Sequence, residues 1–130
     1  MAKMSMTKAA AGAFAAAFVM KLFLFDFIVA EGNSMEPSIH SGTVLLVNRM
    51  RYGLRLPGQR EYLFRWAGPR PGEVLVFFTP SGQLAVKRCG ELVDRGNIMA
   101  LGDNSLQSYD SRSYGPVPVE NIIGKVLGVK

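Results

Sequence analysis

Hydrophobic residues are distributed along the chain as one long run near the N-terminus followed by many short runs. The long run covers residues 9–25 and contains one charged residue, Lys21. No polar face recurs along it, which argues against a soluble amphipathic helix. The short runs are rich in β-branched and aromatic residues and are separated by Gly and Pro, a pattern typical of strands and turns. The sequence therefore predicts one N-terminal helix followed by a mainly β domain.

The short runs predict strands at residues 25–30, 43–48, 72–78, 83–88, 97–101 and 122–129. Residues 79–82, Thr-Pro-Ser-Gly, are a turn signal, so the strands on either side are expected to form a hairpin. Residues 49–70 contain several Gly and Pro residues and predict a loop insertion with one short strand at 61–66. Residues 114–118 predict a rigid connector before the closing strand.

Two interpretations of the N-terminal run remain open. A removed secretory signal peptide has a positive start, an apolar stretch and Ala-x-Ala triplets, and all three are present. A membrane anchor needs about 20 apolar residues, and cleavage inside the alanines would still leave a hydrophobic stub before residue 26. We favour a transmembrane anchor at residues 9–25. Lys3 and Lys8 then place residues 1–8 in the cytoplasm and residues 26–130, the β-rich domain, on the outer side.

Composition and charge narrow the classes of function. The net charge is +5, and the excess lies in residues 49–70, which hold six arginines and one acid. The rest of the chain is balanced, so a basic face for nucleic acid is not supported. The arginines and aromatic residues of this insertion leave two interpretations open, a contact with anionic lipid headgroups or a solvated loop. One histidine and one cysteine, Cys89, leave no ligand set for a metal, and no cofactor is expected.

The candidate chemistry begins at residues 32–37, Gly-Asn-Ser-Met-Glu-Pro, a polar bend that ends an apolar run. A serine hydroxyl such as that of Ser34 becomes a nucleophile when a base takes its proton. The histidine, His40, lies in a polar loop, which disfavours a Ser-His-Asp triad. Lys87 lies in an apolar strand, and burial there would lower its pKa enough for it to act as the base. The competing interpretation is a turn serine and a solvated strand lysine.

Four segments, in this order, resemble the sequence boxes of type I signal peptidases, the Ser-Lys proteases that trim secretory precursors. They are Ser-Met-Glu-Pro at 34–37, Gly-Glu-Val-Leu-Val-Phe at 72–77, Val-Lys-Arg at 86–88 and Gly-Asp-Asn-Ser-Leu-Gln-Ser-Tyr-Asp-Ser-Arg at 102–112. The first resembles the nucleophile box and the third the lysine box. The last is the most specific of the four, and together the boxes are spread over most of the chain beyond residue 29.

The resemblance implies a fold, a location and an activity. The fold would be a compact, coiled or barrel-like β-sheet catalytic domain with one N-terminal transmembrane helix. The protein would cross the inner (cytoplasmic) cell membrane once, with the catalytic domain on the extracytoplasmic side. It would cut secretory precursors after small residues in an A-x-A pattern, with Ser34 as nucleophile and Lys87 as general base. The alternatives are a specialised pilin- or conjugation-type processing protease of the same clan, or an inactive β domain that binds extended peptides at the membrane.

The resemblance also implies supporting roles around the two central residues. The backbone N–H of Ser34 would bind the oxyanion, and Asn33 is a further candidate donor. Gly32 stands where some members carry a serine hydroxyl, so it cannot supply that donor. Ser108 would hydrogen-bond and orient Lys87. The expected walls of the peptide groove are Ala30, Met35, Ile39 and Val86.

Two further expectations concern the framework of the site. Asp110 and Arg112 are expected to form an ion pair, together with Arg88, that holds the last box in place. The chain also departs from the family pattern, because 13 residues separate Arg88 from Gly102, where members usually carry a further β insertion. It therefore resembles a minimal catalytic core that lacks the usual cap subdomain.

Overall fold

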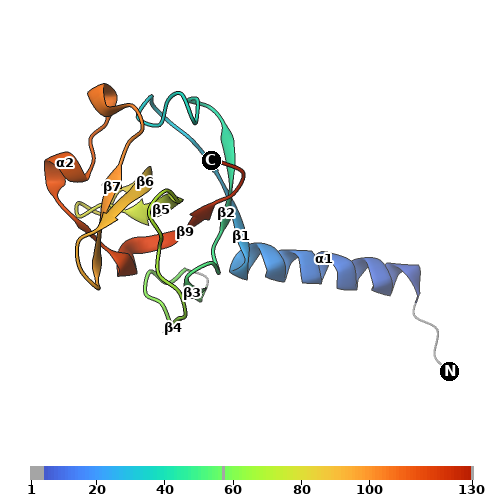
Figure 1. Ribbon diagram of the computed structural model, residues 1–130. Coiled ribbons are helices and arrows are strands. Elements are labelled where there is room, and N and C mark those ends of the chain that lie inside the picture. Colours follow the sequence, from blue (N-terminus) through green and yellow to red (C-terminus); the bar gives the residue numbers. More distant parts are fainter. Residues whose placement is uncertain (1–4, 57, 130) are drawn as a thin grey trace.

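The computed structural model describes residues 5–56 and 58–129 (Figure 1). The elements in chain order are α1 (Met6–Phe23), β1 (Phe25–Val29), β2 (Val44–Asn48), β3 (Gly53–Leu54), β4 (Phe64–Arg65), β5 (Val74–Phe78), β6 (Leu84–Leu92), β7 (Asn97–Leu101), η1 (Ser105–Gln107), α2 (Ser111–Tyr114), β8 (Val117–Pro118), η2 (Val119–Asn121) and β9 (Ile122–Val126). A mainly β domain after one N-terminal helix, as the hydrophobic pattern predicts, is confirmed.

Within the described residues, the strands form a seven-stranded sheet in the order β1-β2-β9-β5-β6-β7-β8 and a separate two-stranded sheet of β3 and β4. Every pair of neighbouring strands is antiparallel. The large sheet curls into a half-barrel, so that segments distant in its strand order come to face one another (Figure 1). This curl brings the chain after β1 towards β6, where the candidate nucleophile and base lie.

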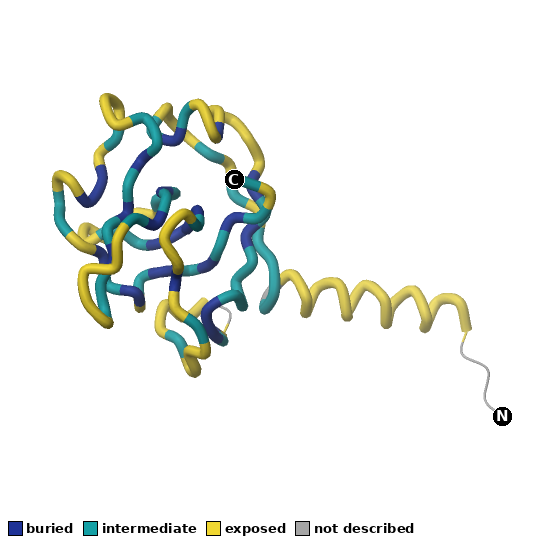
Figure 2. The backbone as a smooth tube through the Cα atoms, in the orientation of Figure 1, coloured by how far each residue is buried: buried dark blue, intermediate teal, exposed yellow. Residues whose placement is uncertain are grey.

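The core lies on both faces of the central strand β5. Val74 and Val76 pack into one apolar cluster, and Leu75 and Phe77 pack into another. All four side chains are buried, which explains why this strand is a continuous apolar run rather than an alternating one. Figure 2 shows the buried residues gathered on the strands of the domain, while α1 is exposed from Met6 to Lys21. The domain therefore holds its core without help from α1.

Most predicted strands are present with shifted ends. β6 extends to Leu92, beyond the predicted end at residue 88, because it continues into pairing with β7. β9 ends at Val126 rather than at residue 129, since Gly128 turns the chain with a φ of 79°. The predicted connector at 114–118 contains the end of α2 and the short strand β8.

The arginine-rich insertion is docked on the domain. Tyr52 is buried in the core, and Arg55 is 4% exposed, with its Nη2 donating to the carbonyl oxygens of Glu120 at 3.2 Å and Ile122 at 2.7 Å. The Arg55 guanidinium also lies over the Tyr62 ring, 4.2 Å from its centroid. The interpretation of this segment as a loop that is solvated throughout is therefore wrong. The carbonyl groups of Glu120 and Ile122 need hydrogen-bond donors, and Arg55 supplies them.

The expected transmembrane anchor at residues 9–25 is not found. α1 begins at Met6 and ends at Phe23, because Phe25 already pairs with Asn48 in the sheet. Among the residues that the structure describes, no helix has both the length and the apolar character needed to cross a membrane.

Candidate active site

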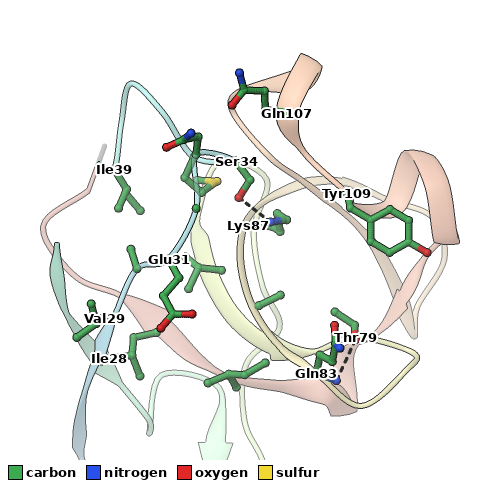
Figure 3. A pocket seen from close by; sticks show the side chains of 17 residues that line it. Ile28, Val29, Glu31, Ser34, Ile39, Thr79, Gln83, Lys87, Gln107 and Tyr109 are labelled. Atoms are coloured by element: carbon green, nitrogen blue, oxygen red, sulfur yellow. Dashed lines mark hydrogen bonds between the residues drawn. The ribbon is translucent and has the colours of Figure 1, made fainter. Parts of the chain in front are cut away.

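Ser34 and Lys87 meet although they are 53 positions apart in the sequence. Lys87 Nζ donates a hydrogen bond of 2.8 Å to Ser34 Oγ (Figure 3). Ser34 lies in the turn after β1, and Lys87 lies on β6, directly opposite Leu75 of β5. A proton on the serine hydroxyl is thus within direct reach of the lysine amine.

The surroundings of Lys87 favour its neutral form. The residue is 8% exposed, and burial lowers the pKa of its amine, against a smaller opposing effect from the negative charge of Asp110. Water would stabilise the ammonium form, and the apolar strands around Lys87 exclude it. Cys89, two residues further along β6, is also buried, and burial raises the pKa of its thiol to about 11. Cys89 is therefore a packed thiol, and Lys87 is the residue with basic character at this position.

The segment after β7 holds the serine turn in place. The Asn104 N–H donates to the Ser34 carbonyl at 2.9 Å, and Asn104 Nδ2 donates to the Asn33 carbonyl at 3.0 Å. Gly102 lies against the same turn so closely that a Cβ on it would be 2.7 Å from the Ser34 carbonyl oxygen and 2.0 Å from Ser108 Oγ. A glycine is required at this position because any side chain would displace either Ser108 or the serine turn.

Asp110 is the central acceptor of the framework beneath the site. It is fully buried and caps α2, and it accepts hydrogen bonds from the Gly102 N–H at 2.8 Å and from Ser108 Oγ at 2.6 Å. Arg112 forms the expected ion pair with it through Nη2 and Nε. Burial raises the pKa of Asp110, but the hydrogen bonds from Arg112, Ser108 and the backbone outweigh burial and hold that pKa well below its usual range.

Two expected contacts have different partners in the structure. Arg88 makes its carboxylate pair with Asp103, through Nη2 at 2.7 Å and Nε at 2.8 Å, and not with Asp110 as the sequence suggested. The strand direction at Arg88 points its guanidinium to the start of the last box rather than to its end. Ser108 was expected to hydrogen-bond Lys87, but its hydroxyl donates to Asp110, and no bond between Ser108 and Lys87 occurs in the described parts of the chain. Its orienting role stays a prediction.

A cavity of about 670 Å³ opens beside the two central residues (Figure 3). All four residues expected as groove walls line it: Ala30, Met35, Ile39 and Val86. Polar and aromatic residues that no sequence pattern assigns to the groove line it too, namely Glu31, Thr79, Gln83, Gln107 and Tyr109. Most of them lie in turns and loops, where no hydrophobic periodicity marks which side chains share a surface.

Two strand edges face this cavity. β1 is the terminal strand of the large sheet, with β2 on one edge. β6 pairs with β5 from Leu84 to Arg88, whereas its pairing with β7 begins at Arg88, so residues 84–87 have one neighbouring strand in the structure as described. Alternate N–H and C=O groups on these two stretches point away from their partner strands, and both stretches line the cavity. The cavity is therefore a groove with hydrogen-bonding edges along both sides.

The turn of Ser34 also offers a backbone donor. No hydrogen bond from the Ser34 N–H occurs within residues 5–56 and 58–129. Gly32, two residues earlier, adopts a φ of 78°, which allows the sharp bend before Ser34. The backbone carbonyl of Asn33 accepts from the Glu36 N–H at 3.2 Å as well as from Asn104, so Asn33 helps to fix the bend.

Comparison with known proteins shows similarity to signal peptidases and to a mitochondrial inner membrane protease. The family model described as signal peptidase, peptidase S26 matches residues 3–92 and 84–129. Signal peptidase I of Bacillus caldolyticus is 28% identical over 82% of this chain and 80% of its own length. Signal peptidase I of Pseudomonas aeruginosa is 35% identical over 85% of this chain but 37% of its own length. Mitochondrial inner membrane protease subunit 1 of Xenopus tropicalis is 27% identical over 80% of this chain and 68% of its own length.

Proposed function

Because the chain belongs to the signal peptidase family, peptidase S26, we propose that it is a Ser-Lys endopeptidase that removes signal peptides from secretory precursors. The observation that carries the proposal is the 2.8 Å contact between Lys87 Nζ and Ser34 Oγ beside an open groove. A buried lysine in direct contact with a groove-lining serine supplies a base and a nucleophile without a histidine.

In the proposed acylation step, neutral Lys87 takes the proton of Ser34 Oγ as the oxygen attacks the substrate carbonyl carbon. The carbonyl becomes an oxyanion, which the Ser34 N–H would stabilise, since that donor is not occupied within the described residues. The protonated lysine then gives its proton to the departing amine as the peptide bond breaks. The N-terminal part of the substrate remains as an ester on Ser34.

Deacylation would use Lys87 as the base again, with a water molecule in place of Ser34 as the nucleophile. Lys87, neutral again, takes a proton from a water molecule, and the resulting hydroxide attacks the ester carbonyl. Collapse of the second tetrahedral intermediate returns the proton to Ser34 Oγ and frees the new carboxyl end. Asp110 and Arg112 take no proton in this scheme, because they pair with each other and neither residue lines the groove.

The groove supports an extended substrate. A peptide that lies between residues 29–33 and residues 84–87 would add a strand to both edges, and its backbone would supply most of the hydrogen bonds. Side chains on one face of that strand would point to the apolar walls formed by Ala30 and Val86, which belong to the cluster of Met35 and Ile39. We expect small residues such as alanine at the first and third positions before the cut to fit these walls best.

The experiment that tests the proposed function is cleavage of a secretory precursor whose signal peptide ends in Ala-x-Ala. We expect the purified full chain to cut after the second alanine, and the Ser34→Ala variant to release no product, with the cut site fixed by mass spectrometry. Absence of cleavage by a folded wild-type chain would favour a specialised substrate or a peptide-binding function instead.

Cleavage should increase with pH. The base must be neutral, and burial lowers the pKa of Lys87, so the rising limb of kcat/KM should lie below the ordinary lysine value of about 10.4. Activity is lost as the pH falls through this lowered pKa, because the amine then carries a proton. A kcat/KM profile measured from acid to alkaline pH checks this, and a flat profile would contradict lysine as the base.

We also propose that the protein associates with a lipid bilayer through α1. The residues of α1 from Met6 to Lys21 are exposed, among them Phe14 and Phe18. The outer face of the adjoining strands is apolar as well, with Phe27, Val29 and Val44 each more than half exposed. Contiguous apolar surface of this kind is costly in water. The exposed Phe64 and Trp66 of the arginine-rich insertion offer a second lipid contact. An extracytoplasmic domain stays a prediction.

Flotation with liposomes tests this association. The wild type should float with vesicles of phosphatidylcholine and phosphatidylglycerol, and the double variant Phe14→Glu, Phe18→Glu should lose most of that binding. Leu106→Glu, which changes a residue on η1 that is 94% exposed, is the matched control. Equal flotation of the double variant and the wild type would show that α1 is not the lipid contact.

A further inference from the structure

Glu31 lines the groove three residues before Ser34 (Figure 3). It is the acidic residue among those that line the cavity, where Lys87 is the basic one. No hydrogen bond or ion pair to the Glu31 carboxylate occurs within the described residues, and the charge that acts on Lys87 is that of Asp110. Glu31 therefore neither stabilises the fold by pairing nor tunes the base, and its carboxylate is available to a substrate.

We propose that Glu31 selects a basic residue at the second position before the cut bond. The inference rests on the proposed function and adds to it a specificity-determining residue. Because Lys87 is neutral when substrate binds in the proposed mechanism, the carboxylate of Glu31 is the remaining charge on the groove wall. It would attract a lysine or arginine side chain and repel an aspartate or glutamate.

The alternation of side chains along a strand indicates which residue of the substrate lies on the same face as Glu31. Ile28 and Ala30 pack towards the apolar cluster of Met35, whereas Val29 is exposed on the other face. Glu31 follows Ala30 and is likewise exposed, so it continues the face of Val29. In an added strand, directly opposite residues share a face. The first and third residues before the cut point to Ala30, and the second points to the face of Glu31.

The test uses three peptides that end in Ala-Lys-Ala, Ala-Gln-Ala and Ala-Glu-Ala before the cut, and it measures kcat/KM for each. The wild type should prefer lysine over glutamate by about fivefold at low salt, because an exposed charge pair contributes modestly and the repulsion adds to the attraction. Glu31→Gln should reduce this ratio to about one, and Glu31→Lys should invert it. The ratio should also decrease in high salt, as screening requires.

Each ratio is measured within one variant, so differences in folded fraction cancel. Glu91→Gln, the same loss of charge at an exposed residue of β6 that does not line the groove, should keep the wild-type ratio. An unchanged ratio in Glu31→Gln, or a wild-type ratio of one, would overturn the assignment of Glu31 while leaving the protease function intact. Failure to cleave any of the three peptides would instead overturn the proposed function, and the inference with it.

Discussion

Replacing Lys87 by methionine should lower kcat by at least about 10³-fold, since no other base contacts Ser34 in the described structure. Methionine keeps most of the aliphatic length of the side chain opposite Leu75 of β5, and removes the amine. The fold should persist, because the burial that lowers the pKa of Lys87 shows that the charged amine is not stabilised there. Steady-state kinetics and a thermal unfolding curve check both parts.

Two further variants separate a base from a mere hydrogen-bond donor. Lys87→Arg keeps donors near Ser34 but cannot become neutral, so it should be as inactive as Lys87→Met. Lys125→Met makes the same change on β9, where the amine lies 3.4 Å from Glu73, and should retain activity. Substantial activity in Lys87→Arg would show that the lysine acts by positioning alone and would exclude it as the general base.

Replacing Gly102 by alanine should both destabilise the domain and lower kcat/KM by about 10²-fold or more. The new Cβ would lie 2.0 Å from Ser108 Oγ and 2.7 Å from the Ser34 carbonyl oxygen, so the serine turn or the last box must move. Overpacking of this kind typically costs about 1–3 kcal/mol, and a displacement of about 1 Å in the reacting atoms is enough for the loss of rate. Chemical denaturation and peptide cleavage measure the two effects.

Gly96→Ala is the matched control for this substitution. A Cβ at Gly96 would find Asp94 Oδ1 at 3.8 Å as its nearest neighbour, which is ordinary contact. We expect wild-type kinetics and little change in stability for this variant. Similar behaviour of the two variants would mean that the close approach of Gly102 to the serine turn does not control the geometry of Ser34.

Local patterns in the sequence determined the elements and marked Ser34 and Lys87 as the candidate nucleophile and base. Strands such as β5 and β2 are apolar runs bounded by Gly, Pro and polar residues, and this signal depends on neighbours along the chain. Ser34 and Lys87 were recognised because their surrounding boxes resemble a known family, and the family comparison agrees with that resemblance. The fold class follows from the same patterns.

Contacts between distant segments were decided by the tertiary structure alone. The curl of the sheet sets which strand edges face the groove, and it places Glu31, Gln107 and Tyr109 around it although nothing in their sequence spacing marks them. Arg55 reads as a solvated loop cation, yet it is buried because carbonyls of residues 120 and 122, more than 60 positions away, require donors. Both Asp103 and Asp110 carry the charge that would attract Arg88. The path of β6 brings the Arg88 guanidinium to Asp103, and the pair therefore forms there.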